Sequence, residues 1–199
     1  MHTIANFITD FGDAAVTVPL AAVTIVLLIA LRRPRLALDW AACIIACAGV
    51  IGAAKLFLAG CSHRIAVPDV TSPSGHAALG TVVYGGFALL LGSRLGTIER
   101  RTVYAGAALL IGGIAVTRVL LHAHGVAETA LGLGVGLAAV AVFRAVLAAN
   151  PPVRLPVEWL CGGALICILV MHGTRWPAEL MIHGLAGSGL FYAVVPWCR

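Results

Sequence analysis

Seven long apolar runs with few charged residues make up most of this sequence. They lie near residues 14–31, 36–59, 77–92, 102–121, 126–148, 157–171 and 178–196. A membrane-spanning helix needs about 20 apolar residues, and apolar surface of this extent must be hidden from water. Because 61% of the 199 residues are hydrophobic and only 11% are charged, a soluble globular, disordered or coiled-coil protein is excluded. The runs do not alternate in polarity, which excludes an outer-membrane barrel.

We therefore expect an all-α fold, a polytopic transmembrane helix bundle of six to seven spans. The last run is rich in glycine and has two alternatives, a full span or a re-entrant or tilted element. Proline-containing breakers separate other runs at residues 33–35 and 150–152. Because the runs use up nearly the whole chain, we expect a single domain over residues 1–199, with a motif-bearing core at about 36–148.

Basic residues are distributed unevenly between the two ends of the expected spans. One set of alternate ends carries nine of the thirteen: Arg32, Arg33, Arg35, Arg94, Arg100, Arg101, Arg144, Arg154 and Arg199. Basic loops are retained in the cytoplasm, so the first residue is expected outside and, if all seven spans form, the last residue inside. No basic residue precedes the first run, so we expect it to remain in the mature protein. The pattern predicts an integral protein of a bacterial inner membrane.

The outer ends of the spans gather basic and imidazole side chains but few carboxylates. Their polar residues are Lys55, Ser62, His63, Arg64, Asp69, Thr71, Ser72, Ser74, His76, Arg118, His122, His124, Glu128, His172, Arg175 and His183. Such a layer suits an anionic ligand, most naturally a phosphate, and repels a divalent metal. The net charge is +5, but the basic residues do not share a face, so we expect no nucleic-acid partner. The six cysteines predict neither a disulfide framework nor a zinc site.

Two local patterns indicate where an anion would bind. The first is Ser74-Gly75-His76, which opens the third run. A hydroxyl and successive backbone N–H groups at a helix start bind anions, although an ordinary N-cap is the commoner role of a serine there. The second is Arg118, followed six residues later by His124 and four further on by Glu128. If a helix starts between them, the carboxylate can orient the imidazole as a nucleophile, or the two can merely pair at a helix end.

These segments resemble the second and third signature motifs of the type 2 phosphatidic acid phosphatase superfamily of integral membrane lipid phosphatases. The family's Pro-Ser-Gly-His stands at residues 73–76. Its Ser-Arg, five residues, His, three residues, Asp is matched by Thr117-Arg118, His124 and Glu128, with threonine for serine and glutamate for aspartate. The first motif, usually Lys, six residues, Arg-Pro, is degenerate, since eight residues separate Lys55 and Arg64.

The resemblance implies roles for the polar residues at the outer face of the membrane. His124 is expected to attack phosphorus and form a phosphohistidine, with Glu128 supporting it and His76 acting as general acid. The residues expected to hold the phosphate oxygens are Lys55, Arg64, Ser74, Gly75 and Arg118. Candidate headgroup contacts are His63, His122 and Arg175. No metal or other cofactor is expected, because the cations supply the charge that a magnesium ion brings elsewhere.

The expected substrate is a lipid phosphate or diphosphate that enters from the outer leaflet among the membrane lipids. Undecaprenyl diphosphate, phosphatidate, phosphatidylglycerol phosphate and lipid A all fit, and the sequence predicts no oligomeric state. Two alternatives share the fold: a lipid phosphotransferase using the same histidine, and a non-catalytic lipid-binding or transport protein. A metal-dependent hydrolase with histidine ligands and a serine hydrolase with Ser74 as nucleophile are less favoured.

Overall fold

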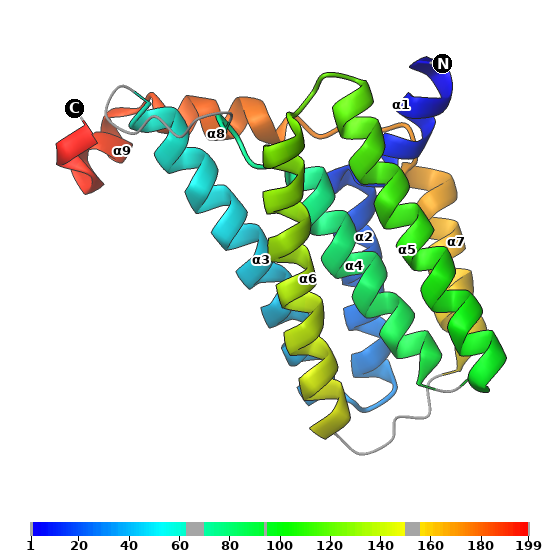
Figure 1. Ribbon diagram of the computed structural model, residues 1–199. Helices are drawn as coiled ribbons and strands as arrows, with labels where there is room; N and C mark the ends of the chain where they lie inside the picture. Colours follow the sequence, from blue (N-terminus) through cyan, green and yellow to red (C-terminus); the bar gives the residue numbers. More distant parts are fainter. Residues whose placement is uncertain (1, 63–69, 94, 150–155, 199) are drawn as a thin grey trace.

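The computed structural model describes residues 2–62, 70–93, 95–149 and 156–198 (Figure 1). Within these ranges the regular structure is helical: α1 (His2–Asp10), α2 (Ala14–Ala30), α3 (Pro34–Gly60), α4 (Gly75–Gly92), α5 (Thr97–Leu120), α6 (Val126–Ala149), α7 (Val157–Met171), α8 (Ala178–Ala186), α9 (Gly189–Val194) and the short 3-10 helix η1 (Pro196–Cys198). The expected all-α helical bundle is confirmed.

Five segments of the described chain are long and apolar enough to cross a membrane. They are Thr3–Ala30, Pro34–Gly60, Gly75–Gly92, Thr97–Leu120 and Val126–Ala149. A sixth helix, α7, has only 15 residues but runs beside α2 in the bundle (Figure 1). The protein is therefore an integral membrane protein built around six bundle helices.

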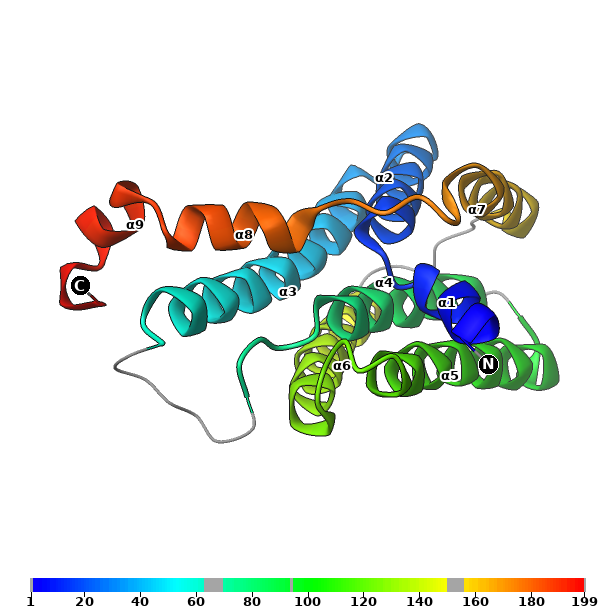
Figure 2. The ribbon, with the colours of Figure 1, turned by 90° about the horizontal axis from the view of Figure 1, so that it is seen from above.

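The last apolar run does not form a span. Its first part, α8, has only nine residues. Ser188 then interrupts the helix, because its side chain accepts a hydrogen bond from the Phe191 N–H and caps the start of a new helix, α9. Nine helical residues reach only about 14 Å, so α8 lies across the end of the bundle beside α3 (Figure 2). The condition for an inside carboxyl terminus is therefore not met. Both ends of the described chain lie at the same end of the bundle (Figure 1).

Helix α4 is the centre of the packing, because it contacts α2, α3, α5 and α6. Trp40 of α3 is fully buried and packs against Gly86 of α4 and the ring of Phe143. At the other end of α4, a Cβ on Gly132 of α6 would collide with the Ser74 carbonyl. This glycine lets α6 approach the first turn of α4, which brings the segments around Ser74 and Glu128 together.

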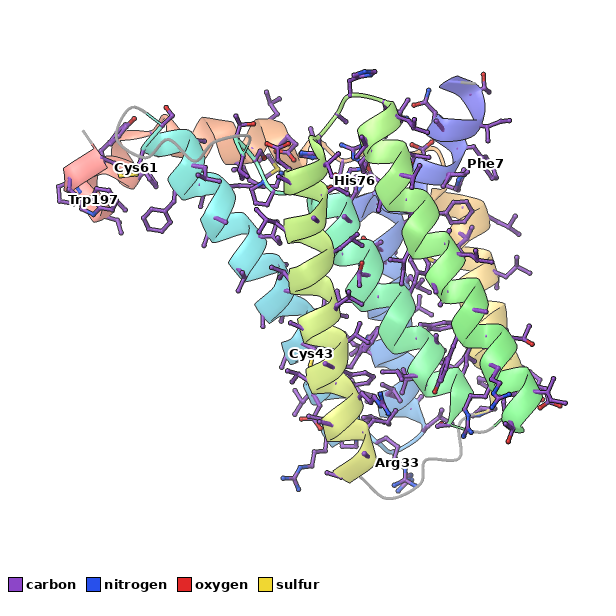
Figure 3. The ribbon with its side chains drawn as sticks, viewed as in Figure 1. Phe7, Arg33, Cys43, Cys61, His76 and Trp197 are labelled. Atoms are coloured by element: carbon purple, nitrogen blue, oxygen red, sulfur yellow. A yellow bond between two sulfur atoms is a disulfide. The ribbon has the colours of Figure 1, made fainter. Side chains whose placement is uncertain are left out.

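A disulfide between Cys61 and Cys198 joins the end of α3 to the last described turn. The sequence prediction of no disulfide framework was wrong here, because 137 residues separate the two cysteines and no local spacing reveals the pair. Phe191 packs against it, and Phe57 lies edge-on to Phe191 and stacks on Trp197. Figure 3 shows Cys61 and Trp197 at the same corner of the molecule. The bond holds the segment that carries α8 and α9 to the carboxyl-terminal end of α3.

Replacing Cys198 by serine is expected to lower the thermal unfolding midpoint in detergent. A native disulfide closing a long loop contributes about 2–4 kcal/mol, chiefly by restricting the unfolded chain. Thermal unfolding of the oxidised protein, the reduced protein and the variant measures the effect. Cys161→Ser is the matched control, since Cys161 is exposed and unpaired. An equal midpoint for the oxidised protein and Cys198→Ser would contradict the expectation.

Candidate active site

The candidate residues meet at the end of the bundle where α3 and α5 finish and α4 and α6 begin. A cavity of about 140 Å³ lies there between the α1–α2 turn, α3, α4 and α8. Its polar lining includes Asp13, Lys55, His76 and Glu179. Figure 3 shows His76 at this end of the bundle and Arg33 at the opposite end. Segments far apart in the sequence thus converge on one polar layer.

Glu128 connects two sides of this layer through both of its carboxylate oxygens. Oε1 accepts hydrogen bonds from the backbone N–H and hydroxyl of Thr71 and from the Ser72 N–H, each at 2.7 Å. Oε2 lies 3.1 Å from His124 Nδ1 and accepts a bond from the Gly125 N–H at 3.0 Å. Both the histidine and glutamate side chains are buried, with exposed fractions of 6% and 7%. The predicted one-turn pairing is present, and it also holds the segment before α4.

His124 lies between α5 and α6, outside the helical spans. Burial lowers its pKa from the ordinary value of 6.5, and the nearby charges of Arg118 and Lys55 act in the same direction. The hydrogen bond with Glu128 opposes this by favouring the charged form. Because Glu128 occupies Nδ1, the neutral ring with its proton on Nδ1 has a lone pair at Nε2. This is the tautomer that a nucleophilic histidine requires.

Arg118 brings a guanidinium group to the end of α5. Its Nη1 donates to Thr9 Oγ1 at 3.4 Å, but its buried Nε has no hydrogen-bond partner among the described residues. A buried charged donor without a partner is costly, so an acceptor supplied by a ligand would offset that cost. The chemistry of the donor fits an oxyanion.

Lys55 places its ammonium group beside the start of α4. Its Nζ donates to Ser72 Oγ at 2.9 Å and forms an ion pair with Glu179 of α8. The carbon next to the ammonium lies within 3.8 Å of a Cβ built on Gly75, so the lysine runs directly past the helix start. The glutamate was not among the predicted site residues, because its α8 position does not show in the sequence.

Ser74 acts as the N-cap of α4, which was the alternative interpretation of this residue. Its Oγ accepts a hydrogen bond from the Ala77 N–H at 3.4 Å, and its backbone N–H donates to the Glu128 carbonyl at 3.0 Å. The side chain is fully buried. The cap uses only a lone pair of the hydroxyl oxygen. The hydroxyl proton can therefore still be donated to a ligand.

His76 follows in the first turn of α4 and has a partner that the sequence did not reveal. Its Nε2 lies 3.3 Å from Oδ2 of Asp13, in the turn between α1 and α2. The two residues are 63 positions apart in the sequence, and only the folded chain brings them together. The signal available in the sequence was Asp13 itself, a carboxylate at the start of an apolar run.

The candidate headgroup residues do not all join this cluster. Arg175 binds Asp10 Oδ1 at 2.9 Å, and His122 is exposed in a turn with a positive φ of 52°. The remaining two predicted site residues, His63 and Arg64, lie outside the described residues. In the described part of the chain, no three His, Cys, Asp or Glu side chains are arranged as a metal-binding group.

The amino-acid sequence was compared with models of known protein families. Residues 57–151 match the model of the PAP2 superfamily, the type 2 phosphatidic acid phosphatases. Over this range the chain is similar to the PAP2 superfamily. The matched range contains the second and third motifs, including His76, Arg118, His124 and Glu128, but starts just after Lys55.

A curated relative of this protein is known from Klebsiella pneumoniae. It is named "Uncharacterized 22.5 kDa protein in cps region" and is 28% identical over 189 residues, covering 91% of this chain and 89% of its own length. No solved structure matches the chain. The comparisons therefore support the interpretation that this protein is a member of a phosphatase superfamily. They do not identify its substrate, which has to be inferred from the chemistry of the site.

Proposed function

We propose that the protein is a membrane lipid phosphatase that hydrolyses a lipid phosphate or diphosphate through a phosphohistidine, without a metal ion. The observation that carries the proposal is the buried His124–Glu128 pair, with a 3.1 Å contact at Nδ1. Arg118 lies close to it, and its Nε has no hydrogen-bond partner among the described residues. An oriented neutral imidazole beside an unused cationic donor suits attack on a phosphate ester.

In the proposed reaction, His124 Nε2 attacks phosphorus and the bond to the lipid oxygen breaks. His76 gives its proton to the leaving oxygen. The charge on the nonbridging oxygens is stabilised by Lys55 and Arg118, together with Arg64, the Ser74 hydroxyl and the Gly75 N–H. Water then attacks the phosphohistidine, which releases inorganic phosphate and frees the imidazole.

The site is proposed to face the outside of a bacterial inner membrane. Six of the nine basic residues in the described ranges lie toward the other end of the bundle, where Arg33 is found (Figure 3), and basic ends are typical of the cytoplasmic side. The Cys61–Cys198 disulfide lies at the end that holds the site, and disulfides persist in oxidising compartments such as the periplasm. The substrate would enter from the outer leaflet.

Phosphate release by the purified protein in EDTA tests the proposal. The substrates are undecaprenyl diphosphate, phosphatidate, phosphatidylglycerol phosphate and lipid A, each in mixed micelles. We expect inorganic phosphate from at least one of them and an acid-labile phosphoenzyme in rapidly quenched samples. Transfer of phosphate to an added lipid acceptor without inorganic phosphate would favour a phosphotransferase. Absence of both reactions would overturn the enzymatic assignment and favour a lipid-binding protein.

The pH dependence of kcat/KM is expected to reflect the lowered pKa of His124. Protonation removes the Nε2 lone pair, so activity falls on the acid side as the ring becomes charged. Since burial lowers the pKa below 6.5, the midpoint of the acid limb should lie below pH 6.5. A pH–rate profile of kcat/KM in detergent measures this, and an acid limb centred above pH 6.5 would contradict it.

Removing the charge of Glu179 is expected to strengthen binding of anionic ligands. The carboxylate pairs with Lys55, so an incoming phosphate must compete for the same ammonium group. An exposed or partly exposed ion pair is worth up to about 1 kcal/mol, so Glu179→Gln should lower KM and the Ki for inorganic phosphate by about 3- to 5-fold. Glu158→Gln, in the first turn of α7, is the charge-matched control. Unchanged or weaker inhibition by phosphate in Glu179→Gln would contradict the expectation.

A further inference from the structure

Asp13 is a buried carboxylate that contacts the proposed general acid. Only 4% of the residue is exposed, and its Oδ2 lies 3.3 Å from His76 Nε2. Both residues line the cavity of about 140 Å³ that Lys55 also borders. A buried carboxylate is costly unless it is paired and hydrogen-bonded, so the contact between these two side chains is significant for both of them.

The position of Asp13 is fixed by the backbone around it. Its Oδ1 accepts hydrogen bonds from the Ala15 N–H at 2.8 Å and the Trp176 N–H at 3.3 Å, which leaves Oδ2 for the imidazole. Gly12 allows the turn to lie against α4, because a Cβ there would come within 2.7 Å of an Ile114 methyl group and 3.2 Å of the His76 carbonyl oxygen. The carboxylate is therefore held in one orientation by three separate segments.

We infer that Asp13 is a positioning residue for His76: it orients the imidazole and stabilises its charged form while the ring delivers a proton to the leaving oxygen. The inference rests on the proposed phosphatase function. The chain thus contains two carboxylate–histidine pairs at one site, Glu128 with the nucleophile and Asp13 with the acid. Because Asp13 binds Nε2, the other ring nitrogen, Nδ1, is the one that donates to the substrate.

The proton transfer matters most when the leaving group is a poor one. As the Nε2 lone pair of His124 forms its bond to phosphorus, the bond from phosphorus to the lipid oxygen breaks and its electron pair goes to that oxygen. An alkoxide is too basic to leave unaided, so it takes the proton from His76 Nδ1 and departs as an alcohol. A nitrophenolate leaves without protonation. Loss of Asp13 should therefore harm the first reaction far more than the second.

The test compares Asp13→Asn with the wild-type protein on two monophosphates in EDTA. One is phosphatidate, with an alkoxide leaving group, and the other is a long-chain alkyl-substituted nitrophenyl phosphate. Asparagine keeps an oxygen acceptor for the Ala15 and Trp176 N–H groups but removes the charge next to His76. General acid catalysis is worth about 10²–10⁴-fold, so we expect kcat on phosphatidate to fall by about 30- to 100-fold and kcat on the aryl ester by less than about 3-fold.

Asp10→Asn is the matched control, because Asp10 contacts Arg175 instead of a histidine, and it should show no difference between the substrates. Asp13 is the N-cap of α2. Asp13→Ser, which keeps a side-chain oxygen that can cap the helix, repeats the test if the asparagine variant fails to fold. Equal losses on both substrates, or no loss on phosphatidate, would overturn the role of Asp13 while the wild-type activity preserves the proposed function. A wild-type protein that releases phosphate from neither ester nor from any of the other three candidate lipids would instead overturn the proposed function, and the inference with it.

Discussion

Replacing His124 by asparagine is expected to reduce phosphate release by at least about 10³-fold, since removing a catalytic nucleophile leaves only binding and charge stabilisation. Asparagine retains a polar side chain that can still interact with Glu128, so the fold should be disturbed little. The loss should appear in kcat, with KM changed much less. Steady-state release from the preferred lipid phosphate, together with rapid quenching, measures both the rate and the acid-labile phosphoenzyme.

His122→Asn is the control for this variant. His122 lies two residues away but is exposed, so we expect at most a few-fold change in kcat. A His124→Asn protein with more than a tenth of the wild-type kcat would contradict the nucleophilic role. Binding would then have to be separated from catalysis by measuring lipid affinity directly.

The bundle could be predicted from the sequence because membrane insertion leaves a long-range, low-resolution signal. Runs of about 20 apolar residues must become spans, and six of the seven expected runs correspond to helices, α2, α3, α4, α5, α6 and the shorter α7. The run at 178–196 had the composition of a span but not its continuity, since Ser188 starts a new helix. Composition measures hydrophobicity, whereas capping decides where a helix ends.

The local part of the site could be predicted for a similar reason. His124 and Glu128 are four residues apart, so one helical turn brings them together, and the 3.1 Å contact agrees with this expectation. The pairs Asp13–His76 and Lys55–Glu179 join residues from segments far apart in the sequence. No spacing rule connects such residues, because their contact depends on how the α1–α2 turn, α3, α4 and α8 pack.

Glu128 illustrates how both kinds of information combine in one residue. The sequence predicted its contact with His124, and the structure adds three hydrogen bonds to Thr71 and Ser72. The glutamate stands where the family pattern has aspartate, one methylene shorter. The extra length lets a single carboxylate reach the imidazole and the segment before α4 together. What resembled a conservative exchange is therefore linked to the position of the segment before α4.

Glu128→Gln is expected to lower kcat by about 10³-fold, by analogy with the loss caused by amide substitution at a histidine-orienting carboxylate. The carboxylate accepts at both oxygens, whereas an amide accepts at only one. With the amide oxygen toward Thr71 and Ser72, the NH2 group faces His124 Nδ1 and favours the tautomer that has its proton on Nε2, which cannot attack. With the amide reversed, the NH2 group faces three donors and the segment before α4 loses its anchor.

Glu128→Asp separates these two functions of the side chain. The shorter carboxylate can orient His124 but cannot also reach the Thr71 and Ser72 donors, which the glutamate binds at 2.7 Å. Since hydrogen bonds to a charged group are worth about 1.5–3 kcal/mol each, we expect a lower thermal midpoint and a raised KM, with kcat closer to the wild-type value than in Glu128→Gln. Equal kcat values for the aspartate and glutamine variants would show that the carboxylate charge at His124 is not what sustains catalysis.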